Sequence, residues 1–543
     1  MTEQASLIVE GCSDTDLEPS RRAPWRRLAV VCLLLAGGCF RGENKSNQAT
    51  VRGGPPLAGI TLKLLVVDDP EMAKALRLLR GQWQGSSGAE LEVAETSEQA
   101  LLAAGPLDAD CLIYPVRDLG LLAERDWLAP LDDTLPQDPS LDWPDVFESP
   151  KNRDAVWGAT PYAVPFGSPV LVCAYRADLL RRIGREPPRT WKEYQQLAEL
   201  LAKQGAATAS EEQASQEQAG QEQPGQEQPG QEQPDGGGEQ PRWAGALEPL
   251  AEGWAGLALL ARAAPYARHR DQVSTWFDIE TMEPLIAGPP FVRALDELAA
   301  AYGNGSHRQL DQGPADVWAA FSQGECGLAI AWPPPGSAGA AGRAAAPRSA
   351  ASGDPVAGTI EIGFVELPGS IDVYGLESRQ WQERRREEQP HVPLLGIDGR
   401  LGSVSKKSPH AEAAFRLLAW LSDPKLSTGV SSASRHATLF RRSHVAEAHK
   451  WVGAEADPEA AALYGEVVER SLDEHVGVDS PRIPGRGRYL AALDRAVRRR
   501  VQGEAASQAA LDEAAAEWRK ITEELGLAAQ RSAYQRSLGL AGS

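Results

Sequence analysis

The sequence predicts an α/β fold with parallel strands, and three stretches of the chain carry this prediction. From Ile60 the segment ITLKLLVVDD alternates and then becomes apolar, as a buried parallel strand does, and DPEMAKALRLLRGQW follows at helical spacing. The scheme repeats with AELEVAET as a strand, SEQALLAAG as a helix and ADCLIYPV as a strand. Between Trp157 and Lys203 an apolar run precedes two more helical patterns. Strands that alternate with helices indicate an α/β domain.

Polar and aromatic side chains stand where two of these strands end. Asp68 and Asp69 close the first strand, and Tyr114 lies at the carboxyl end of ADCLIYPV. Ligands of open α/β sheets bind outside the carboxyl ends of the strands. We therefore expect the two aspartates to hydrogen-bond a ligand and the tyrosine ring to lie against it.

The stretch from Trp157 to Lys203 consists of parts in a fixed order. An extended segment rich in Pro and Gly leads into the apolar run PVLVCAY, and the short helix ADLLRRIG ends at Gly184. After a Pro-Pro turn, Thr190 begins the helix WKEYQQLAELL, and Glu193 stands three residues later, at the spacing of a capping box.

This order resembles the crossover segment of the extracellular solute-binding proteins of ABC importers, in the maltose-binding-protein-like group. The matching residues are Tyr162, Pro165, Tyr175, Asp178, Leu179, Gly184, Pro187, Pro188, Thr190 and Trp191. The asparagine and lysine usual in the family are Arg176 and Ala177 here, so the match is one of pattern. The alternative is a strand-helix-turn-helix unit of any α/β domain. Further phrases in the family's order, from about Ile60 to Leu525, favour the resemblance; among them are LLAERDWLAPLDD, FSQGECGLAIAWPPP and GSVSKKSPHAEAAFRLL.

The resemblance implies a two-lobed periplasmic-binding-protein-like fold of type II, with hinge-linked lobes and a central ligand cleft. The expected boundaries are 59–166 and 360–440 for lobe 1, 167–335 and 441–526 for lobe 2, and 527–543 for a tail. Hinge strands are expected near Pro161 to Pro169 and Trp332 to Phe364. Residues 204–241 repeat Gln, Glu, Pro and Gly, which predicts a disordered insertion in lobe 2, and 336–358 read as a low-complexity loop.

The resemblance also nominates ligand contacts in the second lobe and the hinge. Trp254 lies at the start of an apolar helix that borders the ligand in the family, and Trp332 ends a strand beside prolines. Trp276 belongs to the same lobe, and Ser168 lies in the expected hinge. For each tryptophan the alternative is a place in the core.

Residues 1–38 have the order of an export signal with an N-terminal extension. Four arginines between positions 21 and 27 precede the apolar run Leu28 to Ala36, and Gly37-Gly38 stand before Cys39. LLAGGC resembles a lipoprotein signal-peptidase box, which implies that Cys39 carries lipid and that the chain is extracytoplasmic, anchored to a bacterial membrane. Residues 39–58 then form a flexible tether. The alternative is a chance apolar patch in a cytoplasmic protein.

Charge and cysteine content restrict the function further. The formal net charge of −20 argues against a nucleic-acid partner. Of the six cysteines, Cys111, Cys173 and Cys326 lie within the expected lobes, without metal-type spacing, and one disulfide among them is possible.

We find no sequence pattern for catalysis, since the chain has no GxSxG elbow, no phosphate loop and no HExxH helix. No cofactor and no metal site are indicated. The prediction is a non-enzymatic, monomeric binding protein that captures a small polar solute, a sugar or oligosaccharide, and passes it to an ABC importer permease. The alternatives are a sensor or scaffold lipoprotein with the same fold, and a hydrolase.

Overall fold

The computed structural model describes residues 57–105, 107–131, 138–205, 243–335, 360–453, 457–473 and 476–540. These residues all belong to the compact unit Gly54–Ser543. The predicted signal segment, Cys39 and the 336–358 loop lie outside the described residues, as do all but the last two residues of the tether and all but the first two of the 204–241 insertion. None of the helices that the structure describes has the length and apolar character needed to cross a membrane.

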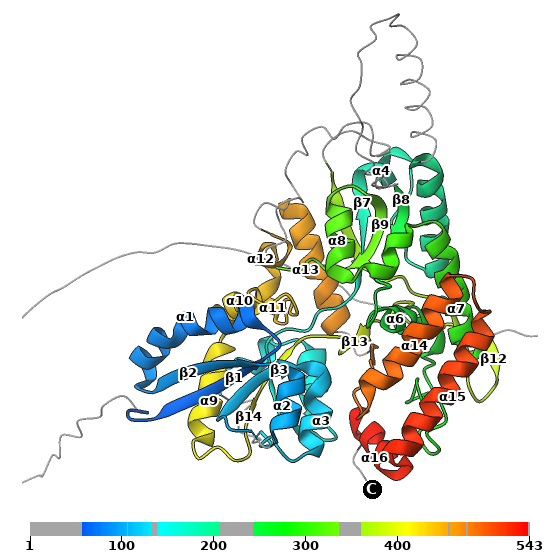
Figure 1. Cartoon of the computed structure of the whole chain (residues 1–543). Helices are drawn as coiled ribbons and strands as arrows, with labels where there is room; N and C mark the ends of the chain where they lie inside the picture. Colours follow the sequence, from blue (N-terminus) through cyan, green and yellow to red (C-terminus); the bar gives the residue numbers. More distant parts are fainter. Residues whose placement is uncertain are drawn as a thin grey trace, which may run out of the picture. The chain divides into compact units, whose positions relative to one another are not determined.

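The first sheet has five strands in the order β2-β1-β3-β14-β6 (Figure 1). Their bounds are Thr61–Val67 (β1), Glu90–Thr96 (β2), Cys111–Pro115 (β3), Val164–Pro165 (β6) and Arg400–Val404 (β14). Strand β1 runs parallel to β2 and β3, whereas β14 runs antiparallel to β3 and β6. The carboxyl ends of β1 and β3 therefore meet at one edge of the sheet.

Helices cover this sheet because its strands bury apolar side chains. Leu62, Leu64 and Val66 of β1 are buried in one cluster with Trp83 of α1 and Leu417 of α9. Asp69 begins α1 as its N-cap. The helices associated with this sheet are α1 (Pro70–Ser87), α2 (Glu98–Ala104), the 3-10 helix η1 (Val116–Asp118), α3 (Leu119–Glu124), α9 (Ala411–Leu421) and α10 (Pro424–Ser431).

The second sheet has four strands in the order β10-β7-β9-β8. Their bounds are Val172–Arg176 (β7), Ala244–Leu247 (β8), Cys326–Ala331 (β9) and Ile362–Glu366 (β10). Strand β7 runs antiparallel to β9 and β10, and β8 runs parallel to β9. The predicted run PVLVCAY includes all of β7 except its last residue, Arg176, and every residue of β8 and β9 is buried.

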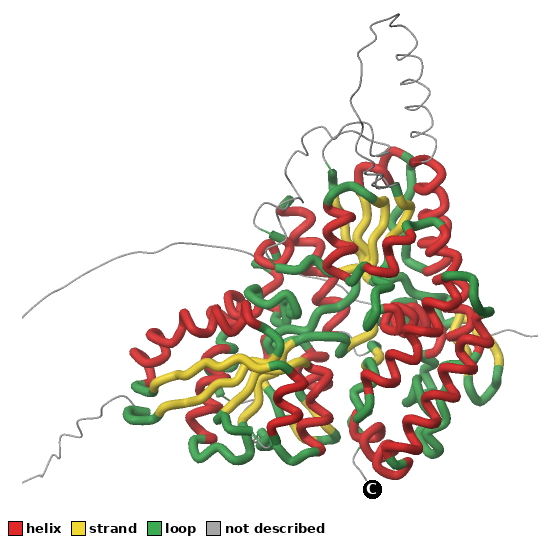
Figure 2. Tube along the Cα trace, in the orientation of Figure 1, coloured by secondary structure: helices red, strands yellow, loops and turns green. Residues whose placement is uncertain are grey.

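Figure 2 shows helices around both sheets. All thirteen residues of α6 are buried, and this helix packs against α7 and α14. The helices of this part are α4 (Ala177–Arg182), a helix over 191–205, α6 (Ala255–Ala267), α7 (Pro289–Gly303), α8 (Pro314–Ser322), α13 (Pro458–Asp473), α14 (Arg486–Val501), α15 (Ser507–Leu525) and α16 (Leu527–Ser537). The shorter elements are η3 (Trp143–Asp145), the π-helix η4 (Pro150–Asp154), β4 (Val156–Trp157), β5 (Thr160–Pro161), η5 (His307–Asp311), β11 (Asp372–Gly375), β12 (Gln380–Glu383), β13 (Leu394–Leu395), α11 (Arg442–Val445), α12 (His449–Val452) and β15 (Val478–Asp479).

Strand pairing corrects one expected boundary and one expected hinge. The chain passes from β6 to β7 between residues 165 and 172, which overlaps the first predicted hinge, Pro161 to Pro169. The second predicted hinge, Trp332 to Phe364, connects β9 to β10, which are strands of the same sheet. The 360–440 segment therefore begins in the second sheet, and the chain returns to the first sheet only between β10 and β14. β10 belongs to the second sheet because its main chain pairs with β7, and the local sequence does not encode that pairing.

The predicted 527–543 tail contains a helix, α16, and Cys111, Cys173 and Cys326 are free and buried. Burial raises the pKa of all three thiols, because the thiolate loses its hydration. The open possibility of a disulfide among them is therefore not realised in the structure, and they act as small apolar side chains.

The predicted capping box at Thr190 is present. The Glu193 amide donates to Thr190 Oγ1 at 3.3 Å, and the Thr190 amide donates to Glu193 Oε2 at 3.1 Å. We expect Thr190→Ala to lower the free energy of unfolding by about 1 kcal/mol, because a helix-terminal amide loses its acceptor. Chemical denaturation measures this loss, and Thr190→Ser, which keeps the hydroxyl, is the matched control. Equal stability of the two variants would contradict the role of the cap.

Candidate functional site

The two aspartates at the end of β1 have different surroundings. Asp68 is exposed, with a backbone φ of 48°, and accepts a hydrogen bond from the Glu98 amide at 3.1 Å. Asp69 is buried and accepts from the Met72 amide at 3.0 Å, which makes it the cap of α1. Only Asp68 therefore presents a carboxylate toward solvent.

Asp69 also belongs to a group of buried and half-buried charges, called here the charged cluster. Its members are Asp69, Arg117, Asp118, Asp398, Arg400, His436 and Arg486. Arg400 is buried at the start of β14 and donates from Nε to Asp69 Oδ2 at 2.9 Å and from a terminal nitrogen to Asp398 Oδ1 at 3.2 Å. It also donates to the Asp68 carbonyl oxygen at 3.1 Å. Arg400 thus joins the end of β1 to the segment before β14.

Asp398 receives partners on both carboxylate oxygens. His436 Nδ1 lies 2.6 Å from Oδ2, and an Arg117 nitrogen lies 3.6 Å from Oδ1. Burial alone would raise the pKa of Asp398, but the hydrogen bond with His436 and the charge of Arg400 outweigh burial and lower the pKa to about 2. Asp398 is therefore a stable anion, and its charge is neutralised within the cluster.

Asp118 has much weaker partners. Burial raises the pKa of this carboxyl to about 7, because the Arg117 ion pair that opposes the shift is long, at 3.9 Å. Its Oδ2 atom and the Nε atom of Arg486 are buried without hydrogen-bond partners. Burial and the charge of Arg117 lower the pKa of Arg486 to about 10. The start of α14 therefore brings a poorly solvated cation close to the end of β3.

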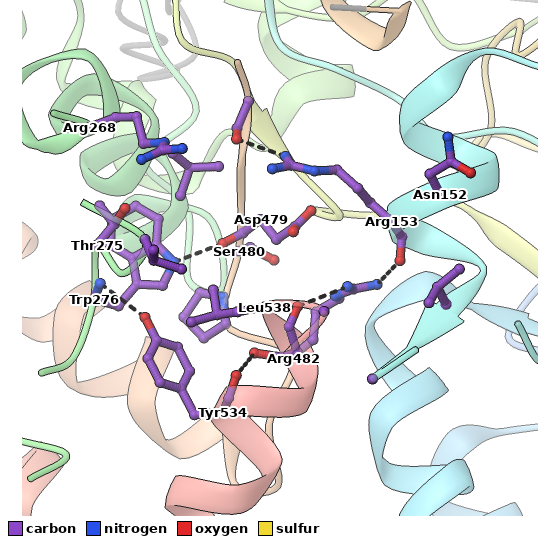
Figure 3. Close-up of a pocket in the computed structure, with 18 residues that line it drawn as sticks. Asn152, Arg153, Arg268, Thr275, Trp276, Asp479, Ser480, Arg482, Tyr534 and Leu538 are labelled. Carbon is purple, nitrogen blue, oxygen red and sulfur yellow. Dashed lines mark hydrogen bonds between the residues drawn. The ribbon is translucent and has the colours of Figure 1, made fainter. Parts of the chain in front are cut away.

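A cavity of about 290 Å³, called here the arginine cavity, lies beside this region (Figure 3). Its walls come from η4 and β4, from the 268–276 segment, from the 477–482 segment and from α16 and the residues after it. The polar and aromatic residues that matter most in its lining are Arg153, Arg268, Thr275, Trp276, Asp479, Arg482 and Tyr534. The volume is near the lower end of the range of about 300–1,000 Å³ that is usual for small-molecule sites.

Hydrogen bonds fix the walls of the arginine cavity. Arg482 donates to the Arg153 carbonyl oxygen at 3.0 Å, and Arg153 donates to the Gly477 carbonyl oxygen at 2.7 Å. The Trp276 ring nitrogen donates to the Asp479 carbonyl oxygen at 2.7 Å, and the Trp276 amide donates to the Tyr534 hydroxyl at 3.3 Å. The tryptophan is therefore held from both sides at the edge of the cavity.

The aromatic residues predicted to contact the ligand lie in different parts of the structure. Trp276 lines the arginine cavity. Trp254 and Trp332 pack edge to face with ring centroids 5.3 Å apart, Trp332 buried and Trp254 half-buried at the start of α6. Tyr114 is fully buried and its hydroxyl lies 2.8 Å from Ser403 Oγ, so its ring has no exposed face to offer a ligand in this structure.

Ser168 is buried as well, and it donates a hydrogen bond to Asp154. Burial raises the pKa of Asp154 to about 6, although the charge of Arg482 and the Ser168 hydroxyl oppose the shift. Ser168 is thus occupied by a neighbouring carboxyl group and does not line the arginine cavity.

Sequence reasoning missed most of the residues that line the arginine cavity. Arg153, Arg268 and Arg482 lie in three separate segments, and none follows a predicted strand. The only local signals were Trp276 and the pair Pro481-Arg482, which begins a phrase at the chain's end that resembles the family. Tyr534 lies in α16, where buried Gln530 and Ser537 interrupt the apolar periodicity that reveals helices.

Comparison with known proteins identifies related folds. A family model described as bacterial extracellular solute-binding protein matches residues 83–426. An ABC transporter solute-binding protein from Agrobacterium radiobacter K84, in complex with ribitol, is 18% identical, with a TM-score of 0.56 over 86% of this chain and 100% of that one. The sugar-binding protein MalE from Xanthomonas citri is 18% identical, with a TM-score of 0.56 over 86% and 98% of the two chains.

Maltose-bound MalE3 from T. maritima is 16% identical, with a TM-score of 0.54 over 85% of this chain and 100% of that one. No curated protein sequence matches the chain. The family model and these structures describe binding proteins, and the solved structures share the two-lobed α/β architecture.

Proposed function

Because the chain belongs to the bacterial extracellular solute-binding proteins, we propose that it captures a sugar or polyol and delivers it to the permease of an ABC importer. The observation that carries the proposal is the match over residues 83–426, which includes β7 to β9, β10 and β14 and so covers strands of both sheets. Structures of similar fold are described with ribitol, D-mannitol and maltose. Sugars and polyols are thus the solutes with which to test this chain first.

We propose the arginine cavity as the place where the solute binds. Its lining comes from a segment that precedes β6, from the 268–276 segment between β8 and β9, and from segments that follow β10, as expected for a site closed by two lobes. Trp276, of which only 2% is exposed, supplies a small apolar surface, while Thr275 and Asp479 supply oxygen atoms. That combination suits a sugar, which has an apolar ring face and a rim of hydroxyl groups.

Closure of the two lobes would follow from the higher affinity of the closed state for the solute. The lipid at Cys39 would keep the protein at the outer face of a bacterial membrane, next to its permease, and a single copy of the chain would suffice. The Asp68 carboxylate and the Trp254–Trp332 pair stay predicted contacts of a larger ligand.

A solute screen tests the proposal. A solute that binds only the folded protein raises the free energy of unfolding, by about 2.7 kcal/mol at a concentration 100 times its Kd. We expect thermal denaturation of the purified chain to shift upward with one class among ribitol, D-mannitol, maltose and monosaccharides. Amino acids and polyamines are the comparison set, for which we expect no shift. Absence of a shift with every sugar and polyol would contradict the proposal.

A further inference from the structure

Arginines outnumber acids in the lining of the arginine cavity. Of its lining residues, Arg153, Arg268 and Arg482 are cationic and Asp479 is the single acid. Among the residues that the structure describes, none of these three arginines forms an ion pair with a carboxylate. In a chain with a formal net charge of −20, this cavity is therefore a local concentration of positive charge.

The hydrogen bonds of these arginines leave their charge unpaired. Arg482 donates to the carbonyl oxygens of Arg153 and Asp154, and Arg153 donates to that of Gly477. Arg268 donates to the carbonyl oxygen of His269 at 3.1 Å. Carbonyl groups are dipoles without net charge, so each guanidinium stays a full cation in partly dry surroundings.

Arg482 is the most deeply buried of the three, because only 2% of its surface is exposed. Its Nε atom is buried and has no hydrogen-bond partner among the residues that the structure describes. A buried donor without a partner lowers the stability of the folded protein, so folding alone does not explain why it is there. The charged form of Arg268 is also disfavoured, since burial and the charge of Arg153 lower the pKa of its guanidinium. Figure 3 shows Arg153 and Arg268 reaching toward the cavity from opposite walls.

The charged cluster provides the contrast. There Arg400 contacts Asp69 and Asp398, and Arg117 lies close to Asp118, Asp398 and Glu98. Carboxylates therefore compensate the charges of Arg400 and Arg117, whereas the three arginines of the cavity have no such ion pair among the described residues.

We infer that the solute of the arginine cavity is an acidic sugar, a sugar that carries a carboxylate, sulfate or phosphate group. Guanidinium groups bind these anions through paired, charge-assisted hydrogen bonds. Asp479, half-buried in the same lining, is placed to accept hydrogen bonds from the hydroxyl groups of the sugar ring. The cavity volume of about 290 Å³ suits one sugar unit and its acidic group. This inference rests on the proposed function, whose solute it specifies.

Matched pairs of sugars test the inference. Isothermal titration of the full-length chain compares D-glucose with D-glucuronate, D-galactose with D-galacturonate, and D-glucose with its 6-sulfate and 6-phosphate. We expect at least one acid to bind about tenfold or more tightly than its neutral parent, and added NaCl to weaken only the acid. The acid that binds most tightly identifies the anionic group.

Variants place the effect in the cavity. We expect Arg268→Gln to reduce the affinity for the acidic sugar about tenfold and so to reduce the preference for the acid over its neutral parent. Arg153→Gln is a second variant with the same expected result, so the test does not depend on one folded mutant. Arg80→Gln, on the exposed surface of α1, is the matched control and should change neither affinity.

The outcomes separate the two proposals. Neutral sugars that bind as tightly as their acids, or variants that leave the acid's affinity unchanged, would overturn the inference and leave the solute-binding function intact. Inorganic sulfate or phosphate that binds as tightly as the sugar acids would also overturn it, because the site would then recognise the anion alone. Failure of every sugar, neutral or acidic, would overturn both.

Discussion

Arg400→Met is expected to lower the free energy of unfolding by about 3–5 kcal/mol, since it leaves buried carboxylates without their cation. Only 1% of Arg400 is exposed, and it contacts Asp69 at 2.9 Å and Asp398 at 3.2 Å. Methionine fills a similar volume but carries no charge, so Asp69 retains only its bonds to Ser434 and the Met72 amide. Chemical denaturation near pH 7 measures the loss.

Arg519→Met is the matched control for this prediction. Arg519 pairs with Glu283 at 2.7 Å, but about half of each side chain is exposed. Exposed pairs of this kind contribute about 0–1 kcal/mol, because water solvates both partners when the pair is broken. In an Asp398→Asn background the loss from Arg400→Met should shrink, since one stranded charge is gone. Similar small losses for Arg400→Met and Arg519→Met would contradict a structural role for the buried pair.

Local sequence was sufficient to predict the parallel strands of the first sheet and their carboxyl edge. The strands near positions 61, 90 and 111 and the two helices between them were predicted from periodicity alone, because β1 and β3 bury alternate or all of their side chains. The Thr190 capping box was visible because a cap and its helix lie within four residues of each other. Asp69 was predicted as a ligand contact and is the cap of α1 in the structure. Such features depend on neighbours in the chain.

The candidate site depends on distant parts of the chain, which explains what the sequence could not show. Arg153, Arg268 and Arg482 meet only after η4, the 268–276 segment and the 477–482 segment have been brought together. Their lack of carboxylate partners is likewise a property of the folded chain. Conversely, Tyr114 stands at a strand end, as ligand-binding residues often do, yet β14 pairs beside it and buries its ring against Ser403.

Between pH 5 and pH 8 the parent protein is expected to lose about 2–3 kcal/mol more free energy of unfolding than the Asp118→Asn variant. Burial raises the pKa of Asp118 to about 7, despite the opposing charges of Arg117, Arg486 and Arg400 and with the help of Glu98. In the unfolded chain the same carboxyl group has a pKa of about 3.9. At pH 5 the folded protein therefore holds a proton that the unfolded chain has released, and that contribution disappears as the pH rises through 7.

Comparing two pH values separates this effect from the cost of the substitution itself. The introduced side-chain amide would be buried where Asp118 Oδ2 lacks a partner, but that cost is the same at pH 5 and pH 8 and cancels in the difference. Other groups, including Asp154 with its pKa near 6, titrate in both proteins and cancel too. Asp108→Asn, at a side chain that is 98% exposed, is the control and should leave the pH dependence unchanged. If Asp118→Asn and the parent protein lose equal stability between pH 5 and pH 8, the proton is not held at Asp118, and the ion pair with Arg117 outweighs burial.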